Sequence, residues 1–360
     1  MDMNSELLFS IVVPACNVEK YVGKTIDSLQ AQTYTDFEAL IVAEESTDGT
    51  EELCRKQTEG DDRFSVIARP CSGSPSAPRN YGIETARGKY IVFIDGDDWI
   101  EPDSLEKFAA ALERYGDIDI LMCALKECFE AEDGVYQFTR KLSNLTKLDE
   151  GRIFTGFEVV TRIGEYGEKP MAQVFLSIYR TAFLRERADL RMVSGIMHED
   201  TQWTPRVWFY AQKVAVLDFA YYIYRRRPSS ITTGSNPQLL MDLPVVLWSL
   251  LEFFHDHEYP AAAKKTWQNH WLSLFYWYFF HPQYQARFSK KVRREALQLM
   301  FKGDRARRYR KFAAGASFPK RPATPLALLA GRYGIVFPAR FYFKFIYYPL
   351  IQWRDKKRDK

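Results

Sequence analysis

Cysteine is scarce in this chain and follows no pattern. Five cysteines are spread irregularly over 360 residues, and no two of them form a CxxC pair. Disulfide frameworks and zinc clusters depend on regularly spaced or paired cysteines, so the sequence argues against both. Reduced thiols, as in cytosolic proteins, are the expected state.

Long hydrophobic runs are also missing. The N-terminus shows no basic segment followed by an apolar one, so no secretory leader is predicted. The uncharged stretch at residues 268–286 contains several polar residues and a proline, whereas a membrane span needs roughly 20 mostly apolar residues. This run is predicted to form a buried aromatic helix. Internal repeats and low-complexity segments are absent from the sequence.

The net charge of +4 hides an uneven distribution of charge along the chain. Residues 290–360 carry 20 Lys and Arg against 4 Asp and Glu, whereas the preceding 289 residues carry 30 against 42. An acidic first part and a basic tail that meets an anionic partner are therefore expected. A membrane surface and an anionic polymer both fit this charge. Nucleic acid is not expected, because no nucleic-acid-binding module is recognisable.

Short apolar runs alternate with helical patterns over the first hundred residues. The apolar runs, each predicted to be a strand, are residues 9–13, 37–42, 64–68 and 90–94. The helical patterns between them are residues 22–32, 50–57 and 79–87. This alternation predicts an α/β domain with a Rossmann-like, mostly parallel sheet and helices on both faces.

The remainder of the chain is less regular. It contains a helical pattern at 102–115, an apolar run at 118–124, an irregular polar stretch at 127–151, predicted strands at 171–179 and 214–224, and a predicted helix at 201–210. Beyond about residue 235 strand signals fade and aromatic, basic helical patterns take over. We therefore expect a first domain of residues 1–235 and a smaller, mainly helical domain of residues 236–360.

Four polar segments directly follow the predicted strands of the first domain. They are residues 14–17 (PACN), 44–46 (EES), 71–74 (CSGS) and 95–98 (DGDD). In sheets of this kind, ligands bind beyond the carboxyl ends of the strands. The four segments are therefore expected to line one binding site.

The acidic segment Asp95-Gly96-Asp97-Asp98 carries the clearest chemical signal. Carboxylates spaced one residue apart at the end of a strand can reach a single divalent cation. Hard cations such as Mg²⁺ prefer oxygen ligands and are usually shared with substrate phosphates. The segment suggests a metal–diphosphate site, and a solvated acidic turn that caps the next helix is the alternative.

An ordered series of motifs makes residues 8–232 resemble a family 2 glycosyltransferase of the GT-A fold. The motifs are residues 10–21 (SIVVPACNVEKY), 32–34 (QTY), 46–50 (STDGT), 79–80 (RN), 88–90 (GKY), 95–98 (DGDD) and 198–200 (HED). Residues 73–80 (GSPSAPRN), together with Tyr224-Arg225 and Ser229-Ser230-Ile231, are similar to enzymes that glycosylate wall teichoic acid. The resemblance therefore implies a transferase that acts on teichoic-acid-like or capsular polymers.

The resemblance also implies where the donor and a metal ion bind. Mn²⁺ or Mg²⁺ would be held by Asp97, Asp95 and Asp98, with Asp97 as the leading ligand. A UDP-sugar would contact Pro14, Ala15, Asn17, Glu19, Glu44, Cys71, Arg79, Asp95 and Gly96. Arg225 and Ser230 would close a loop over the diphosphate, with a basic strand edge as the alternative.

One departure from the family pattern concerns the uracil contact. Ala43, Glu44 and Glu45 stand where the family usually has two Asp and a Gly. Glu44 keeps the carboxylate that accepts a hydrogen bond from uracil, but its side chain is one methylene longer. The departure is also the one feature that favours a non-catalytic binding protein on a degenerate transferase fold.

The resemblance assigns catalysis to residues 199 and 200. Asp200 would be the general base that takes the proton of the acceptor hydroxyl, so that in-line attack inverts the anomeric centre. Glu199 would bind the donor sugar or acceptor hydroxyls, and His198 is expected to be a packing neighbour. The alternative is that both acids only favour the first turn of a helix through its dipole.

The expected function is metal-dependent transfer of a hexose or N-acetylhexosamine from UDP to a cell-envelope polymer at the inner face of the membrane. A lipid-linked oligosaccharide is the alternative acceptor. The basic segment 305–311 and the aromatic segment 341–353 are expected to contact the membrane or a polyanionic polymer, or to form an ordinary helical domain with a solvated basic face. The aromatic second domain is also expected to be able to bury a homo-oligomer interface.

Overall fold

The computed structural model describes residues 7–130, 136–142, 145, 148–170, 172–227 and 234–314. The chain divides into two compact units. The first comprises residues 1–162 and 171–227, and the second comprises residues 163–170 and 228–360.

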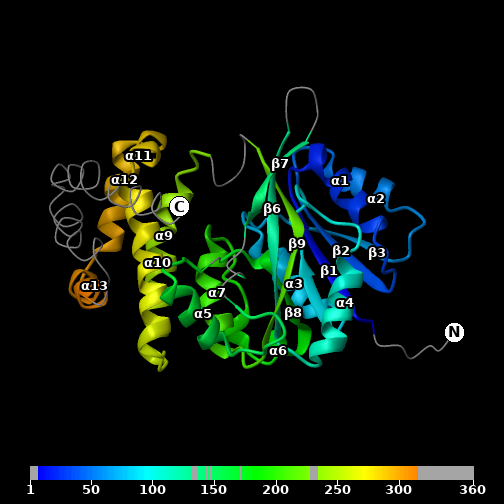
Figure 1. The fold of residues 1–360 in the computed structure, drawn as a ribbon. Coiled ribbons are helices and arrows are strands. Elements are labelled where there is room, and N and C mark those ends of the chain that lie inside the picture. The colour runs from blue at the N-terminus through cyan, green and yellow to red at the C-terminus, as the bar shows by residue number, and fades with distance from the viewer. Residues whose placement is uncertain are drawn as a thin grey trace. The chain divides into compact units, whose positions relative to one another are not determined.

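A mixed sheet forms the centre of the first unit (Figure 1). Its nine strands in the described residues are β1 (Phe9–Ala15), β2 (Phe37–Glu44), β3 (Phe64–Arg69), β4 (Tyr90–Phe93), β5 (Trp99–Ile100), β6 (Ile120–Glu130), β7 (Tyr136–Leu142), β8 (Ser177–Arg180) and β9 (Val214–Arg226). They run in the order β3, β2, β1, β4, β8, β6, β9 and β5, and β7 pairs with β6. The first four in this order are mutually parallel, as the sequence predicts, and β6 is parallel to β9. Strands β5, β7 and β8 pair antiparallel with their neighbours.

Helices cover both faces of this sheet. Figure 1 shows α1 (Glu19–Gln30), α2 (Thr50–Gln57) and α4 (Ser104–Tyr115) on one side, and α3 (Ser76–Thr85), α6 (Thr181–Arg185) and α7 (Glu199–Tyr210) on the other. Strand β1 faces both layers because its side chains alternate. Phe9, Ile11 and Val13 belong to the core that also holds residues of α1 and α4, whereas Val12 meets α3. The unbroken apolar character of β1 therefore reflects burial on both faces.

Helix α3 approaches β1 closely because residue 82 is glycine. A Cβ atom at Gly82 would lie 2.4 Å from Cγ2 and 2.5 Å from Cγ1 of Val12, closer than real carbon contacts allow. Gly82→Ala is therefore expected to overpack the interface and to lower the free energy of unfolding by about 1–3 kcal/mol, measured by thermal unfolding.

Val12→Ala supplies the matched control for this close approach, because it removes both of the methyl groups that Gly82→Ala would meet. The double variant should lose less free energy of unfolding than the two single variants lose in sum. Strict additivity of the two losses would contradict the close approach.

The second unit is helical and aromatic in its described part. Its helices are α8 (Gln238–Met241), α9 (Leu243–Asp256), α10 (Ala261–Phe280), α11 (Pro282–Arg287), α12 (Lys290–Met300) and α13 (Arg305–Ala314), and α5 (Gly156–Glu165) connects the units in sequence. The buried aromatic helix predicted at 268–286 is confirmed over the part that lies in α10, which buries Trp271, Phe275 and Tyr276. Among the described residues, Gln238–Asp256 is long and apolar enough to cross a membrane by length and composition, and 67% of that stretch is buried in the structure.

Candidate active site

Hydrogen bonds join the segments that follow β1 to β4 at one edge of the sheet. The N–H of Gly96 donates to the carbonyl of Pro14 at 3.1 Å, which connects the ends of β4 and β1. The N–H of Ser72 donates to Oε1 of Glu44 at 3.1 Å, which connects the segments after β3 and β2. Ala15 is buried next to Pro14. The segments that the sequence placed at one site are thus in contact with one another.

Asn17 connects the loops after β1 and β2. Its backbone is left-handed, with φ of 52°, a conformation that Asn tolerates better than most residues. Its Oδ1 accepts hydrogen bonds from the N–H and the hydroxyl of Thr47, both at 2.8 Å. Glu19 lies against the same turn. A Cβ atom added to Gly49 would be only 2.6 Å from Oε1 of Glu19. Asn17 and Glu19 therefore lie where these two loops meet.

Cys71 lies beside the loop after β1. Its side chain is exposed and neighbours the partly buried Cys16. Burial raises the pKa of Cys16, and the neighbouring Cys71 and Glu44 raise this pKa further. The Cys16 thiol accordingly favours its neutral form.

Arg79 on α3 connects two carboxylates that lie 104 residues apart in the chain. Its Nη2 donates to Oδ1 of Asp95 at 2.6 Å, and its Nη1 donates to Oε1 of Glu199 at 2.7 Å. The Arg79 side chain is only 3% exposed. Burial alone would lower the pKa of Arg79, but the two carboxylates raise it above its ordinary value, so the guanidinium stays charged.

Asp98 faces into the protein rather than toward solvent. Its Oδ2 accepts from the hydroxyl of Tyr222 and its Oδ1 accepts from the N–H of Arg225, both at 2.7 Å. The same Tyr222 oxygen accepts the N–H of Asp95 at 3.1 Å. Burial, and then the neighbouring aspartates, raise the pKa of Asp98 well above its ordinary value. Asp98 thus connects the acidic segment to strand β9.

Asp97 and Asp95 keep accessible carboxylates, with side chains 20% and 25% exposed. Oδ2 of Asp97 forms an ion pair with Nη2 of Arg227 at 2.6 Å. Burial raises the pKa of Asp97, although Arg227 acts in the opposite direction. Sequence reasoning did not single out Arg227, and its only signal was the run of three arginines at 225–227. In the described part of the chain, no three His, Cys, Asp or Glu side chains are grouped to hold a metal ion.

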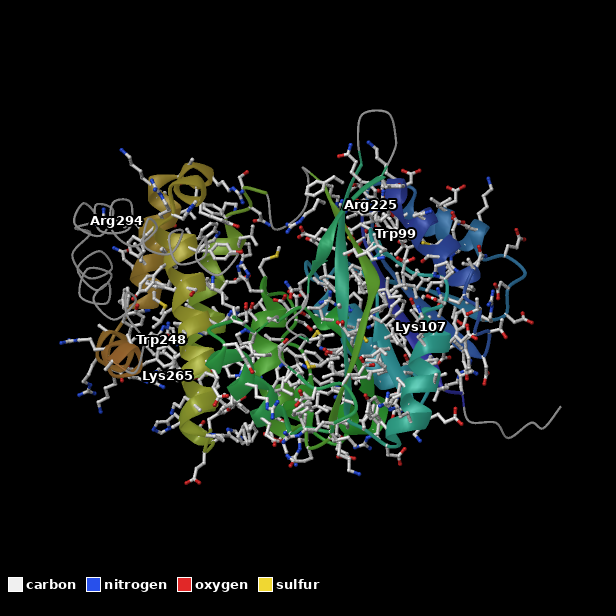
Figure 2. The ribbon with its side chains drawn as sticks, in the orientation of Figure 1. Trp99, Lys107, Arg225, Trp248, Lys265 and Arg294 are labelled. Carbon is white, nitrogen blue, oxygen red and sulfur yellow. The ribbon has the colours of Figure 1, made fainter. Side chains whose placement is uncertain are left out.

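Arg225 is buried among aromatic side chains instead of being exposed at the strand edge. Its guanidinium carbon lies 4.8 Å from the ring centre of Trp99 and 5.0 Å from that of Tyr21, and Figure 2 shows Arg225 beside Trp99. Its Nε donates to the carbonyl of Asp97 at 2.9 Å, and its Nη1 donates to the hydroxyl of Tyr136 at 3.1 Å. Arg225 therefore fixes the backbone at Asp97. Ser230 lies outside the described residues.

Glu199 and Asp200 begin helix α7. The preceding His198 has a left-handed backbone with φ of 62°, which turns the chain into the helix. Oδ1 of Asp200 accepts the N–H of Thr201 at 2.6 Å. Burial raises the pKa of both carboxyl groups, against the lowering effect of Arg79 on each.

Comparison with known proteins identifies relatives of this chain. A model of the family described as "Glycosyl transferase family 2" matches residues 10–186. The glycosyltransferase EpsJ of Bacillus subtilis, whose function is uncharacterised, is 32% identical over 261 residues, which are 72% of this chain and 73% of EpsJ. The glycosyltransferase GlyA of Streptococcus pneumoniae is 30% identical over 62% of this chain but only 31% of its own length. The poly(ribitol-phosphate) β-N-acetylglucosaminyltransferase TarS of Staphylococcus aureus is 28% identical over 61% of this chain and 36% of TarS.

Solved structures share the fold. Residues 1–349 of S. aureus TarS, in complex with UDP-GlcNAc, superpose with a TM-score of 0.70 at 20% identity, covering 94% of this chain and 91% of that one. The mannosyltransferase PcManGT of Pyrobaculum calidifontis, in complex with GDP-Man and Mn²⁺, gives a TM-score of 0.51 at 14% identity, covering 91% and 86%. The expected GT-A fold is confirmed by these likenesses. The motifs, the fold and the identity to EpsJ together show that the chain belongs to glycosyltransferase family 2.

Proposed function

We propose that this protein is a metal-dependent, inverting enzyme that transfers a hexose or N-acetylhexosamine from a UDP-sugar to a hydroxyl of a cell-envelope polymer. Teichoic acid or capsular polysaccharide is the proposed acceptor class. The observation that carries the proposal is the Arg79 bridge, in which one buried guanidinium joins the acidic segment to Glu199 and so brings the Glu199–Asp200 pair into the same network. TarS is named as a poly(ribitol-phosphate) β-N-acetylglucosaminyltransferase, and its structure is known in complex with UDP-GlcNAc. The similarity to TarS therefore supports the proposed donor and acceptor classes.

We assign donor binding and catalysis to residues 1–235. Residues 236–360 would contact the acceptor, the inner membrane surface or a second subunit. We assign the protein to the cytoplasm, at the inner face of the cell membrane where UDP-sugars are available.

Asp97 and Asp95 would hold a divalent cation, Mn²⁺ or Mg²⁺. Both are accessible carboxylates, and such cations combine one or two carboxylates with water and substrate phosphate oxygens. The bound cation would neutralise the charge that develops on the leaving diphosphate. Asp98 is better suited to holding Tyr222 and Arg225, since both of its oxygens already accept hydrogen bonds from them.

Glu44 would recognise the uracil ring. Its Oε1 accepts the N–H of Ser72, and we assign its other oxygen to the ring N–H of uracil. The contact with Ser72 fixes the longer Glu side chain between the loops after β2 and β3. Asn17 and Glu19, at the junction of the loops after β1 and β2, would line the same nucleotide site.

We assign the role of general base to Asp200. Its carboxylate would remove the proton of the acceptor hydroxyl while that oxygen attacks C1 of the donor sugar. The bond from C1 to the diphosphate oxygen breaks, UDP leaves with the bonding electrons, and the anomeric centre inverts. Glu199, held by Arg79, would contact the donor sugar or the acceptor hydroxyls.

The activity is expected to depend on pH through Asp200. Burial raises the pKa of Asp200, and the base must be ionised to act, so kcat/KM should fall as the pH is lowered through that raised pKa. The acid limb should therefore lie at a higher pH than an ordinary Asp would give. UDP binding, measured over the same pH range, separates loss of the base from loss of the donor. Activity that stays constant down to about pH 4 would contradict the role, because that is where an unperturbed Asp titrates.

A thermal-shift comparison of UDP, GDP, CDP and dTDP, each with Mn²⁺ and with EDTA, tests the proposed donor. A ligand that binds only the folded state raises the unfolding temperature. We expect a metal-dependent increase with UDP alone. A shift with a different nucleotide would show that the donor carries that nucleotide instead of UDP. The absence of a shift with any nucleotide would favour a non-catalytic protein on this fold.

A further inference from the structure

Helices α12 and α13 concentrate positive charge in the second unit. Residues 290–311 contain ten Lys and Arg but only two Asp and Glu. Seven of the ten cations are exposed: Lys290, Lys291, Arg294, Lys302, Arg307, Arg310 and Lys311. We call these seven side chains the basic face, and Arg294 is labelled in Figure 2.

The charge of the basic face is not neutralised by the described part of the protein. None of its seven side chains forms an ion pair with a carboxylate of a described residue. The neighbouring Arg308 does pair with Glu252, at 3.6 Å, but Arg308 is not part of this face. A dense group of uncompensated cations repels itself and attracts an anionic partner.

The packing of α12 and α13 gives the basic face a firm support. Trp248 of α9 donates its indole N–H to the carbonyl of Met300 at 2.9 Å. The guanidinium groups of Arg305 and Arg308 lie 5.2 and 5.3 Å from the ring centre of the same Trp248. The cations of α12 and α13 are therefore presented from helices that are fixed against a buried aromatic residue.

The same packing argues against insertion into a bilayer. A helix that lies in a membrane interface needs an exposed apolar face opposite its charges. Here Leu297 and Met300 of α12, and Tyr309 and Phe312 of α13, are buried within the protein. The only large exposed apolar side chain on the two described helices is Leu299, at 37%. The surface thus offers charge without an apolar face.

We propose that the basic face binds the phosphate groups of an anionic phosphodiester polymer, which would be the acceptor of the reaction proposed above. This inference rests on the proposed function, since it names the part of the chain that retains that acceptor. Repeated phosphates match a face of several separate cations, and such binding releases counterions and weakens steeply as salt rises. Sugar hydroxyls would add little, so the face would recognise the backbone of the polymer rather than its substituents.

The test measures binding of a synthetic poly(ribitol phosphate) to the full-length protein at several salt concentrations. The variant R307Q/R310Q/K311Q removes three charges of the basic face. The control K56Q/K264Q/K265Q removes three charges elsewhere on the chain. We expect the native protein and the control to bind with a steep salt dependence. The basic-face variant should bind about tenfold more weakly or worse, with a slope of log affinity against log salt lower by about two to three.

Two further probes make the outcome decisive. Neutral dextran of similar length should not bind, and vesicles of phosphatidylglycerol and phosphatidylcholine should bind less strongly than the polymer. Equal polymer binding by both variants, or vesicle binding without polymer binding, would overturn the proposal.

The UDP thermal shift is measured on every variant. Its absence from the native protein would mark failure of the proposed function, whereas its presence with unchanged polymer binding in R307Q/R310Q/K311Q would mark failure of the basic face alone.

Discussion

Asp200→Asn is expected to slow formation of UDP from the donor and acceptor by about 10²–10⁴-fold, the usual contribution of a positioned general base. Asn has nearly the same shape as Asp, and its side-chain oxygen can still accept the N–H of Thr201 that now reaches Oδ1 of Asp200 at 2.6 Å. The start of α7 should therefore remain intact. The substitution thus removes only the carboxylate that we propose takes the proton of the acceptor hydroxyl.

The diagnostic pattern is loss of kcat with little change in donor binding. The UDP thermal shift with Mn²⁺ should be the same for the native protein and Asp200→Asn, and the acid limb of the pH profile should disappear. Thr201→Val is a useful comparison, because it removes the weaker 3.2 Å hydrogen bond from the Thr201 hydroxyl to Asp200 and leaves the carboxylate in place. Retention of more than a tenth of the native rate by Asp200→Asn would show that another group is the base.

Arg79→Lys is expected to damage both stability and catalysis. The guanidinium uses two nitrogens to reach Asp95 and Glu199 at 2.6 and 2.7 Å, and a single ammonium cannot reproduce that fork. At least one carboxylate would then be left without its partner in a buried site, which typically costs about 3–5 kcal/mol. Thermal unfolding should show a clearly lower transition temperature.

The transfer rate of Arg79→Lys should fall by about 100-fold, because Glu199 and Asp95 would no longer be held in register for the reaction. Arg63→Lys is the matched control. Arg63 also forms a forked contact, with Asp61, but both side chains are more than a fifth exposed, so this substitution should cost less than about 1 kcal/mol. Equal effects of the two substitutions would contradict a special role for the Arg79 bridge.

The first half of the sheet could be predicted from the sequence because local pattern determines it. Helix α2 spans Thr50–Gln57 as expected, and each of the four predicted strands begins at the same residue as an observed strand and ends within two residues of its end. Helix α1 begins at Glu19, three residues before the apolar pattern starts, since its first turn is polar and follows the loop of Asn17. Burial on both faces makes such strands continuous apolar runs, which are easily recognised.

The second half of the sheet was harder to predict. The strand expected at 171–179 is a short 3₁₀ helix, Val174–Leu176, followed by β8, because Phe175 turns to stack on Tyr222 at 4.1 Å between ring centres. Strand β7, which contributes Tyr136 to the surroundings of Arg225, lies in the stretch interpreted as irregular. A short antiparallel partner such as β7 depends on pairing with β6, and that pairing leaves no periodic pattern of its own.

In the candidate site, too, some features could be predicted from local sequence and others depend on how distant segments pack. The motifs predicted its residues along the chain, and the loops at adjacent strand ends are in contact as expected. The partners of individual side chains were not predictable from local sequence. Arg79 was expected to contact the UDP-sugar, and its bridge between Asp95 and Glu199, which is 120 residues away in the chain, was not foreseen. Arg225 was expected to close a loop over the diphosphate, and its burial against Trp99 and its hydrogen bond to the Asp97 carbonyl were not foreseen. Such contacts arise only when distant segments pack.

The most direct test of the central claim is transfer itself. The protein would be incubated with Mn²⁺, a panel of UDP-hexoses and UDP-N-acetylhexosamines, and poly(ribitol phosphate), and UDP release would be compared with sugar attached to the polymer. We expect at least one donor to give UDP and polymer-bound sugar in equal amounts, with the anomeric configuration inverted. Tight UDP binding without turnover of any donor, in the presence of Mn²⁺ and polymer, would contradict the claim and leave a nucleotide-binding protein on a transferase fold.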